Sequence, residues 1–282
     1  MDEEEEKRTV LFQKILVAID TSKHSQAALE AAADLARTME ANIHGLFVHD
    51  EIWHRVSRLP SVSSVNTLTG QVTTFEDDTM EDKVRLLQNR LRQKLEQVSK
   101  QHELIHSWRS VKGKVYEKIL EAAEEVDLIT IGLKGASARR KRLGSSARRI
   151  IMEADKPVLI LKEGLRLGST ITAVYDGSSE SQKGIEIALN IAERNESTLT
   201  VLFVSKEPDS EDEQNNRLKN LLQDATVFVE IEQLDQPNVI RFLNAINQQK
   251  SGLLIAPKNQ ALLTKSLQIL LNNINCPLLL MN

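Results

Sequence analysis

The sequence is poor in the residues on which several common classes of protein depend. Cys276 is the only cysteine among 282 residues, which excludes a disulfide framework and any cysteine-based metal site. No apolar run comes near the roughly 20 residues that span a bilayer. The acidic start, Asp2 to Glu6, is the opposite of the basic and then apolar beginning of a secretory signal. These absences predict a cytoplasmic protein with no membrane partner.

Motifs for catalysis and metal binding are also missing. The sequence contains no HExxH, CxxC, GxSxG or GxxxxGK[ST] pattern, which removes the common zinc, redox, hydrolase and P-loop interpretations. An adenylating or pyrophosphatase-type enzyme would need a signature such as SGGxDS or HIGH, and neither occurs. His102 and His106 straddle a predicted helix end, where they do not share a face. We therefore expect no metal site and no catalytic residue, and an enzyme is poorly supported.

Nucleic acid is not an expected partner either, because aromatic residues make up 4% of the chain and the net charge is −4. One basic cluster stands out, and it consists of Arg139, Arg140, Lys141, Arg142, Arg148 and Arg149. It lacks the interleaved aromatic residues on which bases would stack.

Short apolar strands alternate with helical patterns along the chain. Residues 14–20 are nearly all apolar and of strand length, and an alanine-rich segment with helical spacing follows. Strands are expected near 43–49, 104–111, 127–132 and 157–161, and helices near 79–101, 115–125 and 145–153. Strands that are apolar on both faces are typical of a parallel sheet covered by helices on both sides.

The chain repeats this pattern. Ile15 to Asp20 matches Ile171 to Asp176, and Lys156 to Leu159 matches Cys276 to Leu279. Between these landmarks, Leu128 to Ile131 is aligned with Gly252 to Ile255. Two domains, 1–165 and 166–282, are therefore predicted. The second is shorter, largely where the first has Trp53 to Asp78, a segment that either overhangs a ligand site or is a disordered surface loop.

A glycine loop follows the predicted strand at 127–132. Gly132 and Gly135 precede eight residues, and Gly144 with Ser145 and Ser146 then opens an apolar helical pattern. Glycines let backbone amides approach an anion, and a helix start adds N–H groups and a partial positive charge. The loop suits a phosphate chain, although tight turns and helix starts use the same residues for structural reasons alone.

At this point the sequence resembles the universal stress protein family. The matching segments are Ile15 to Ser22, Leu46 to His49, the loop Gly132 to Ser145 and Lys156 to Ile160. The resemblance covers most of residues 14–162 and, more faintly, 170–281. It implies an α/β fold of two tandem doubly wound domains, each a five-stranded parallel sheet flanked by helices.

The resemblance also implies ATP, with or without Mg²⁺, as the cofactor of the first domain. It leaves slow ATP hydrolysis open, since some family members show it, although the sequence indicates no general base. Gly132, Gly135 and Gly144 would line the ribose and phosphates, and Ser145 and Ser146 would donate to the phosphates. Two residues at the end of the first strand, Ala18 and Asp20, would border the nucleoside, and the backbone of Val48 would meet the adenine edge. The family pattern has nine residues between its second and third glycines, whereas this loop has eight.

The second copy departs from the glycine pattern. The sequence alignment places Ala256 and Asn259 opposite Gly132 and Gly135, and Thr264 and Lys265 opposite Gly144 and Ser145. A Cβ at those positions should close the cradle, so no nucleotide is expected there. The turn Asp176 to Ser178 is interpreted as an N-cap.

Two functions remain open at the level of sequence. The first is a stress-response protein in which bound ATP changes conformation or partner choice. The alternative is a nucleotide-free interaction scaffold of the same fold. The apolar closing strands, Val158 to Leu161 and Leu278 to Met281, should not remain as exposed edges. We expect them to pair, either between the two halves of one chain or between two chains.

Overall fold

The computed structural model describes residues 12–50, 63–65, 72–74, 77–135, 144–204, 211–234, 239–249, 251–258 and 261–282. In the first half the elements are β1 (Lys14–Ala18), α1 (Lys23–Met39), β2 (Asn42–His49), β3 (Ser63–Val65), β4 (Val72–Thr74), α3 (Asp77–Gln101), β5 (His106–Lys112), α4 (Val115–Ala123), β6 (Leu128–Gly132), α5 (Ser145–Glu153) and β7 (Val158–Leu161). In the second half they are β8 (Ile171–Tyr175), α6 (Ser179–Arg194), β9 (Leu199–Phe203), α7 (Glu211–Leu222), β10 (Val229–Gln233), α8 (Val239–Gln248), β11 (Leu253–Pro257), α9 (Ala261–Asn273) and β12 (Leu278–Met281).

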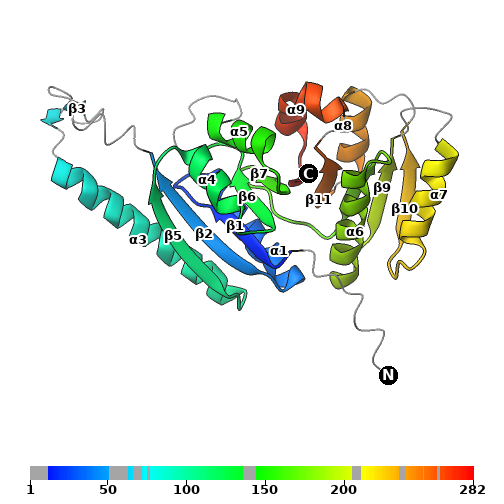
Figure 1. Cartoon of the computed structure of the whole chain (residues 1–282), viewed down its shortest axis with the longest axis horizontal. Coiled ribbons are helices and arrows are strands. Elements are labelled where there is room, and N and C mark those ends of the chain that lie inside the picture. The colour runs from blue at the N-terminus through cyan, green and yellow to red at the C-terminus, as the bar shows by residue number, and fades with distance from the viewer. Residues whose placement is uncertain are drawn as a thin grey trace.

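Both halves are doubly wound parallel sheets, as expected, and they join edge to edge into one ten-stranded sheet (Figure 1). The strand order is β10-β9-β8-β11-β12-β7-β6-β1-β2-β5. All neighbours are parallel except β12 and β7, which pair antiparallel with Leu279 opposite Leu159. The two apolar closing strands therefore cover each other within one chain, which is the first of the two pairings expected from the sequence.

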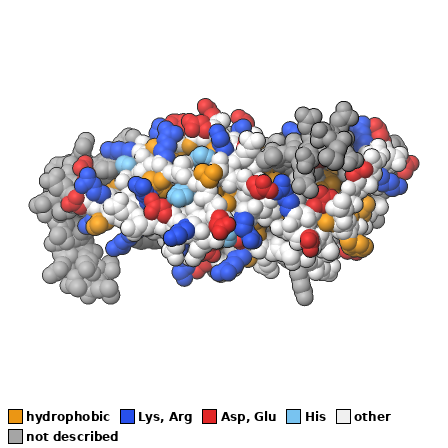
Figure 2. Space-filling view, turned by 90° about the horizontal axis from the view of Figure 1, so that it is seen from below, with side chains coloured by type: hydrophobic (Ala, Val, Ile, Leu, Met, Phe, Trp, Pro, Cys, Tyr) orange, Lys and Arg blue, Asp and Glu red, His pale blue; other side chains and the backbone are white. Residues whose placement is uncertain are grey.

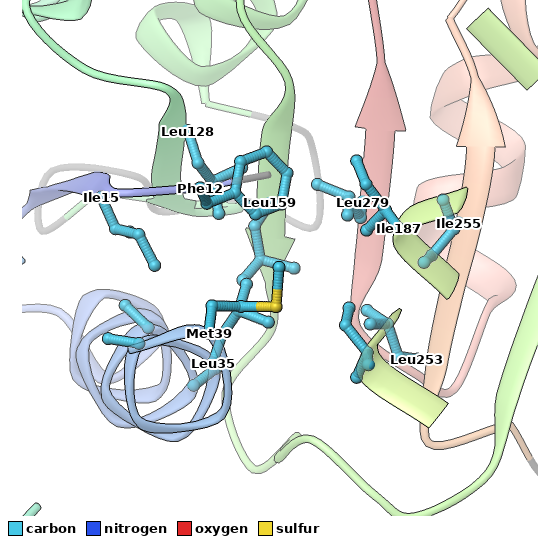
Figure 3. Packing of buried hydrophobic residues seen from close by; sticks show 14 of the residues in the cluster. Phe12, Ile15, Leu35, Met39, Leu128, Leu159, Ile187, Leu253, Ile255 and Leu279 are labelled. Carbon is cyan, nitrogen blue, oxygen red and sulfur yellow. The ribbon is translucent and has the colours of Figure 1, made fainter. Parts of the chain in front are cut away.

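Helices cover both faces of this sheet, and each face has a core that crosses the seam between β7 and β12. One core gathers residues of α1, α3, α6 and α7, and the other gathers residues of α4, α5, α8 and α9. Figure 3 shows Leu159 and Leu279 on the same side of the sheet, with Leu35 and Met39 of α1 to one side and Ile187 of α6 to the other. Because β7 and β12 are buried along their whole length, the seam is part of the core.

The first helix of each half begins at a serine N-cap, and the cap in the second half is the one that the sequence predicts. Ser22 caps α1 by accepting a hydrogen bond from the Ser25 amide, and Ser178 caps α6 by accepting from the Ser181 amide. The other predicted strands and helices of the first half are confirmed to within about two residues at each end.

The structure corrects one alignment between the halves. Ile15 pairs with Leu128 in the first half, and its counterpart Ile171 pairs with Leu253 in the second. Leu253, rather than Gly252, is therefore the equivalent of Leu128, and the position opposite Gly132 is Pro257 rather than Ala256. The same shift places Gln260, rather than Asn259, opposite Gly135.

Most of the segment Trp53 to Asp78 lies outside the described residues, so neither interpretation of it is tested. Within it, β3 and β4 form an antiparallel pair. None of the helices in the described part of the chain combines the length and apolarity needed to cross a membrane.

Candidate functional site

The predicted site residues come together where the strand order of the first half reverses. From β1 the chain moves to β2 on one side, while β6 and β7 lie on the other. Ala18 and Gly132 end the adjacent strands β1 and β6, which run parallel. In doubly wound sheets, ligands bind outside the carboxyl ends of the strands at such a switch point.

Asp20 is held in this crevice by the start of α1. Its Oδ1 accepts from the Ser22 amide at 2.8 Å, and its own amide donates to Ser25 Oγ at 2.8 Å. Ser25 Oγ also donates to the Ala18 carbonyl oxygen at 3.3 Å, and Ser25 is 3% exposed. Ser22 and Ser25 therefore fix the Asp20 turn. The sequence reasoning named neither as part of the site, although their spacing before a helix was a usable signal.

The loop glycines have different roles. A Cβ on Gly132 would lie 2.7 Å from the backbone carbon of His24 and 2.8 Å from the Ser25 nitrogen, so α1 can pack against β6 only because this position is glycine. A Cβ on Gly135 would lie 3.1 Å from Asp20 Oδ2. Gly135 therefore faces the carboxylate, whereas Gly132 serves helix packing.

The two ends of the glycine loop meet, although residues 136–143 lie outside the described part of the chain. The Gly144 amide donates to the Leu133 carbonyl oxygen at 3.2 Å. Gly144 is the N-cap of α5, and a Cβ there would lie 3.7 Å from the Gly135 nitrogen. As a glycine cap it offers no side-chain acceptor to the first-turn amides, which leaves the helix start suited to an external anion. Ser145 is exposed and Ser146 half-buried at this start.

Val48 presents its backbone at the same edge. Ile19 donates to the Leu46 carbonyl oxygen, and pairing between the strands ends at Ala18 with Leu46. In a parallel pair, every second residue directs its N–H and C=O toward the same neighbouring strand. Leu46 faces β1, so the backbone N–H and C=O of Val48 also face the β1 side, beyond the last paired residue of that strand. In the second half the equivalent amide, Val204, donates to Tyr175 O at 2.8 Å.

Two lysines, Lys134 of the loop and Lys162 after β7, lie near enough to His24 to affect its pKa. His24 has its pKa lowered, first by burial and then by the Lys134 charge, while Glu163 and Asp20 act in the opposite direction. Burial likewise lowers the pKa of Lys162, and Lys134 adds to that shift. Nothing in the sequence indicated a role for His24 at the site, since it does not belong to the glycine pattern.

One cavity borders the helix start. It has a volume of about 470 Å³ and is lined by the outward face of α5, namely Ser145, Arg148, Arg149, Met152 and Glu153. The Arg149 guanidinium lies 4.3 Å from the centre of the Tyr116 ring, which holds it in place. Of the predicted site residues, only Ser145 lines this cavity. Arg139, Arg140, Lys141 and Arg142 lie outside the described residues.

The second half has no comparable loop. Only two residues separate Lys258 from the start of α9 at Ala261, and the position opposite Gly144, Thr264, lies inside that helix. Pro257 and Gln260 replace the first two glycines. The described residues of this half therefore contain no glycine cradle. Nor do histidine, cysteine or acidic residues group into a candidate metal site anywhere in the described ranges.

The surface does not suggest another large site on the face shown in Figure 2. Lys and Arg side chains are interspersed there with Asp and Glu, and hydrophobic side chains form small, separate patches. Fold and crevice together define a tandem α/β protein with a candidate anion site at the switch point of its first half.

Comparison with known proteins identifies the family. A model of the universal stress protein family matches residues 11–162 and 169–251. The chain therefore belongs to the universal stress protein family. It is 30% identical over 162 residues to universal stress protein YxiE of Bacillus subtilis (strain 168), covering 54% of this chain and 100% of that protein.

Solved structures support the tandem fold. A universal stress protein from Archaeoglobus fulgidus DSM 4304 superposes with a TM-score of 0.71 at 18% identity, over 95% of this chain and 97% of that one. A functionally unknown protein from Pseudomonas aeruginosa PAO1 gives a TM-score of 0.61 at 15% identity, over 96% and 92% of the two chains. At such identities the likeness concerns the fold alone.

Proposed function

We propose that the chain is a cytoplasmic stress-response protein that binds ATP in its first domain, residues 1–165, and not in its second, residues 166–282. The nucleotide would change its conformation or its choice of partner. The observation that carries this proposal is the meeting of Asp20, Gly135 and Gly144 at the switch point, which occurs although the loop is one residue shorter than the family pattern.

The residues present suit the nucleotide. Gly135 and the first turn of α5 offer backbone amides and serine hydroxyls to the phosphates, and Gly144 leaves room for them because it carries no side chain. The Asp20 carboxylate can accept from ribose hydroxyls, and the Val48 backbone can pair with the adenine edge. Gly132 acts indirectly, by letting α1 pack closely behind the loop. No residue is proposed to catalyse hydrolysis.

The test uses a glycine whose replacement the fold tolerates. Gly144 has φ −61° and only ordinary contacts around a Cβ, so Gly144→Ala should fold normally while placing a methyl group over the Gly135 amide. We expect ATP affinity, measured by calorimetry, to fall about tenfold or more, the effect of losing one or two charge-assisted hydrogen bonds. Gly184→Ala, in α6 of the second half, is the matched control and should leave binding unchanged.

Absence of ATP binding at millimolar nucleotide would reject the proposal, as would equal affinity of Gly144→Ala and the wild type. A folded, nucleotide-free protein is the result that the scaffold alternative predicts. Mass spectrometry of protein purified without added nucleotide gives an independent readout. Any pairing of two chains would have to use surfaces other than β7 and β12, which are already paired.

A further inference from the structure

The segment between β7 and β8, which connects the halves, is hydrogen-bonded to the first turn of α1. The Glu163 amide, just after β7, donates a hydrogen bond to His24 Nδ1 at 2.9 Å. Lys23 Nζ lies 3.0 Å from Glu163 Oε1, but both side chains are at least half exposed, so this ion pair adds little. The contact joins residues 139 positions apart in the sequence, and its central element is the His24 ring.

His24 belongs to the wall of the candidate ATP site. The turn that carries it also carries Ser22 and Ser25, which hold Asp20. The His24 backbone is the surface against which Gly132 packs, at a distance that no Cβ could occupy. A movement of this turn would therefore change the position of Asp20 and the packing against Gly132.

The other end of the connection is fixed to the second half. Lys162 Nζ donates to the Ile274 carbonyl oxygen at 2.5 Å, just before β12. The Gly168 amide donates to the Gly252 carbonyl oxygen at 3.1 Å, just before β11. Figure 1 shows the connection running from β7 across to the second half. His24 is thus the link between the ATP-site wall and a segment held by both halves.

The charges around His24 favour its neutral form while no anion is bound. Lys134 of the glycine loop and Lys162 of the connection lower the pKa of His24, in addition to burial, and Glu163 and Asp20 oppose them. On α1 itself, the neighbouring Lys23 is paired with Glu163. Only an Nδ1 without a proton can accept from the Glu163 amide, so the observed contact requires the neutral ring with its proton on Nε2.

We propose that His24 is a proton-linked positioning residue that couples the ATP site of the first half to the segment joining the halves. The neutral ring accepts from Glu163 and holds that segment against α1. A triphosphate at the glycine loop places negative charge near the ring and favours the imidazolium, which cannot accept. The Glu163 amide is then released. This coupling rests on the proposed ATP binding.

The sign of the pH dependence follows from the direction of the shift. Because the folded protein lowers the pKa of His24, the contact is complete at alkaline and neutral pH and is lost as the pH falls through that pKa. If ATP promotes protonation of His24, protonation must tighten ATP to the same extent. A rise of one unit in the His24 pKa on binding would correspond to about a tenfold gain in affinity at acid pH.

The experiment follows His24 and Glu163 together by NMR. Without nucleotide, the His24 ring and the Glu163 amide should titrate with one common midpoint, and saturating ATP should raise that midpoint. Calorimetry between about pH 8 and about pH 5.5, a range that spans imidazole titration, should show ATP binding that tightens more in the wild type than in His24→Asn. In this variant the Asn oxygen replaces Nδ1 as acceptor but does not titrate, and the titration of ATP itself is common to both proteins.

The outcomes separate the two proposals. Absence of ATP binding would overturn both. ATP binding with an unchanged His24 midpoint, or with the same pH dependence in His24→Asn, would overturn the coupling alone. A Glu163 amide that does not follow the His24 titration would overturn the contact on which the coupling depends. His24→Leu, which removes the acceptor, should show the released Glu163 amide at every pH if the variant is folded. A Glu163 amide that keeps its wild-type shift in a folded His24→Leu protein would also overturn the coupling.

Discussion

At the scale of single residues, the crevice of the first half depends on glycines that are not equivalent. Gly132 has no room for a side chain because the start of α1 lies against it, whereas Gly144 has an ordinary extended backbone with space around it. A glycine pattern read from sequence combines these positions into one motif. In the structure, Gly132 allows two elements to pack closely, whereas Gly144 leaves space beside the Gly135 backbone nitrogen.

This difference predicts opposite effects on stability. Gly132→Ala should lower the free energy of unfolding by about 2 kcal/mol or more, because the methyl group must displace backbone atoms of α1. Gly144→Ala should change it by no more than about 0.5 kcal/mol. Urea denaturation followed by circular dichroism measures both. Equal stability of the two variants would contradict the conclusion that α1 packs too closely on Gly132 to admit a side chain.

At the scale of elements, the segment between β7 and β8 crosses the start of β11 at very short range. A Cβ on Gly252 would lie 2.4 Å from the backbone of Gly168, and the two residues share a hydrogen bond. Contact this close between two backbones needs glycine on both sides. This contact holds the residues before β8 against the residues before β11.

Gly252→Ala should therefore destabilise the protein by about 3 kcal/mol, since neither backbone can move without breaking the pairing of β8 with β11. Gly164→Ala in the same connection is the matched control. Its φ of +79° costs an alanine roughly 1 kcal/mol, but no atom lies within 4 Å of the added methyl group. If thermal or urea unfolding gave the same loss for both variants, the steric explanation for Gly252 would fail.

At the scale of the whole molecule, the antiparallel pair of β7 and β12 makes one sheet of the two halves. Both cores cross that seam, so opening either half would expose apolar residues of the other. We therefore expect the halves to unfold together, although each has the elements of a complete domain.

Two probes, one in each half, test this expectation. Trp108 lies in β5, and Trp53→Phe leaves it as the single tryptophan. Cys276, before β12, is 4% exposed, and burial raises the pKa of its thiol to about 11, so the native thiol should resist labelling near neutral pH. Trp108 fluorescence and Cys276 labelling should give the same urea midpoint. Labelling of Cys276 at urea concentrations where Trp108 is still native would show that the second half opens alone.

The sequence by itself determined what depends on local pattern. Apolar strands alternating with helices, and the ordered repeat of landmarks, predicted the α/β class and the tandem arrangement, and the Asp176 to Ser178 turn predicted an N-cap. It also located the glycine loop, because glycine and serine at a strand-to-helix turn have a direct backbone meaning. These features are encoded within a few residues of one another, which is why they can be recognised without knowledge of the fold.

Tertiary structure alone decided the register of β11, the choice of pairing for β7 and β12, and the contact between His24 and Glu163. A parallel strand buried on both faces carries no polar alternation, so a slip of one residue, which exchanges Ala256 for Pro257 opposite Gly132, leaves no mark in the sequence. Likewise, nothing near His24 or Glu163 in the chain indicates that they meet. Such contacts arise from the packing of distant segments, and their energies depend on distances that only the folded chain defines.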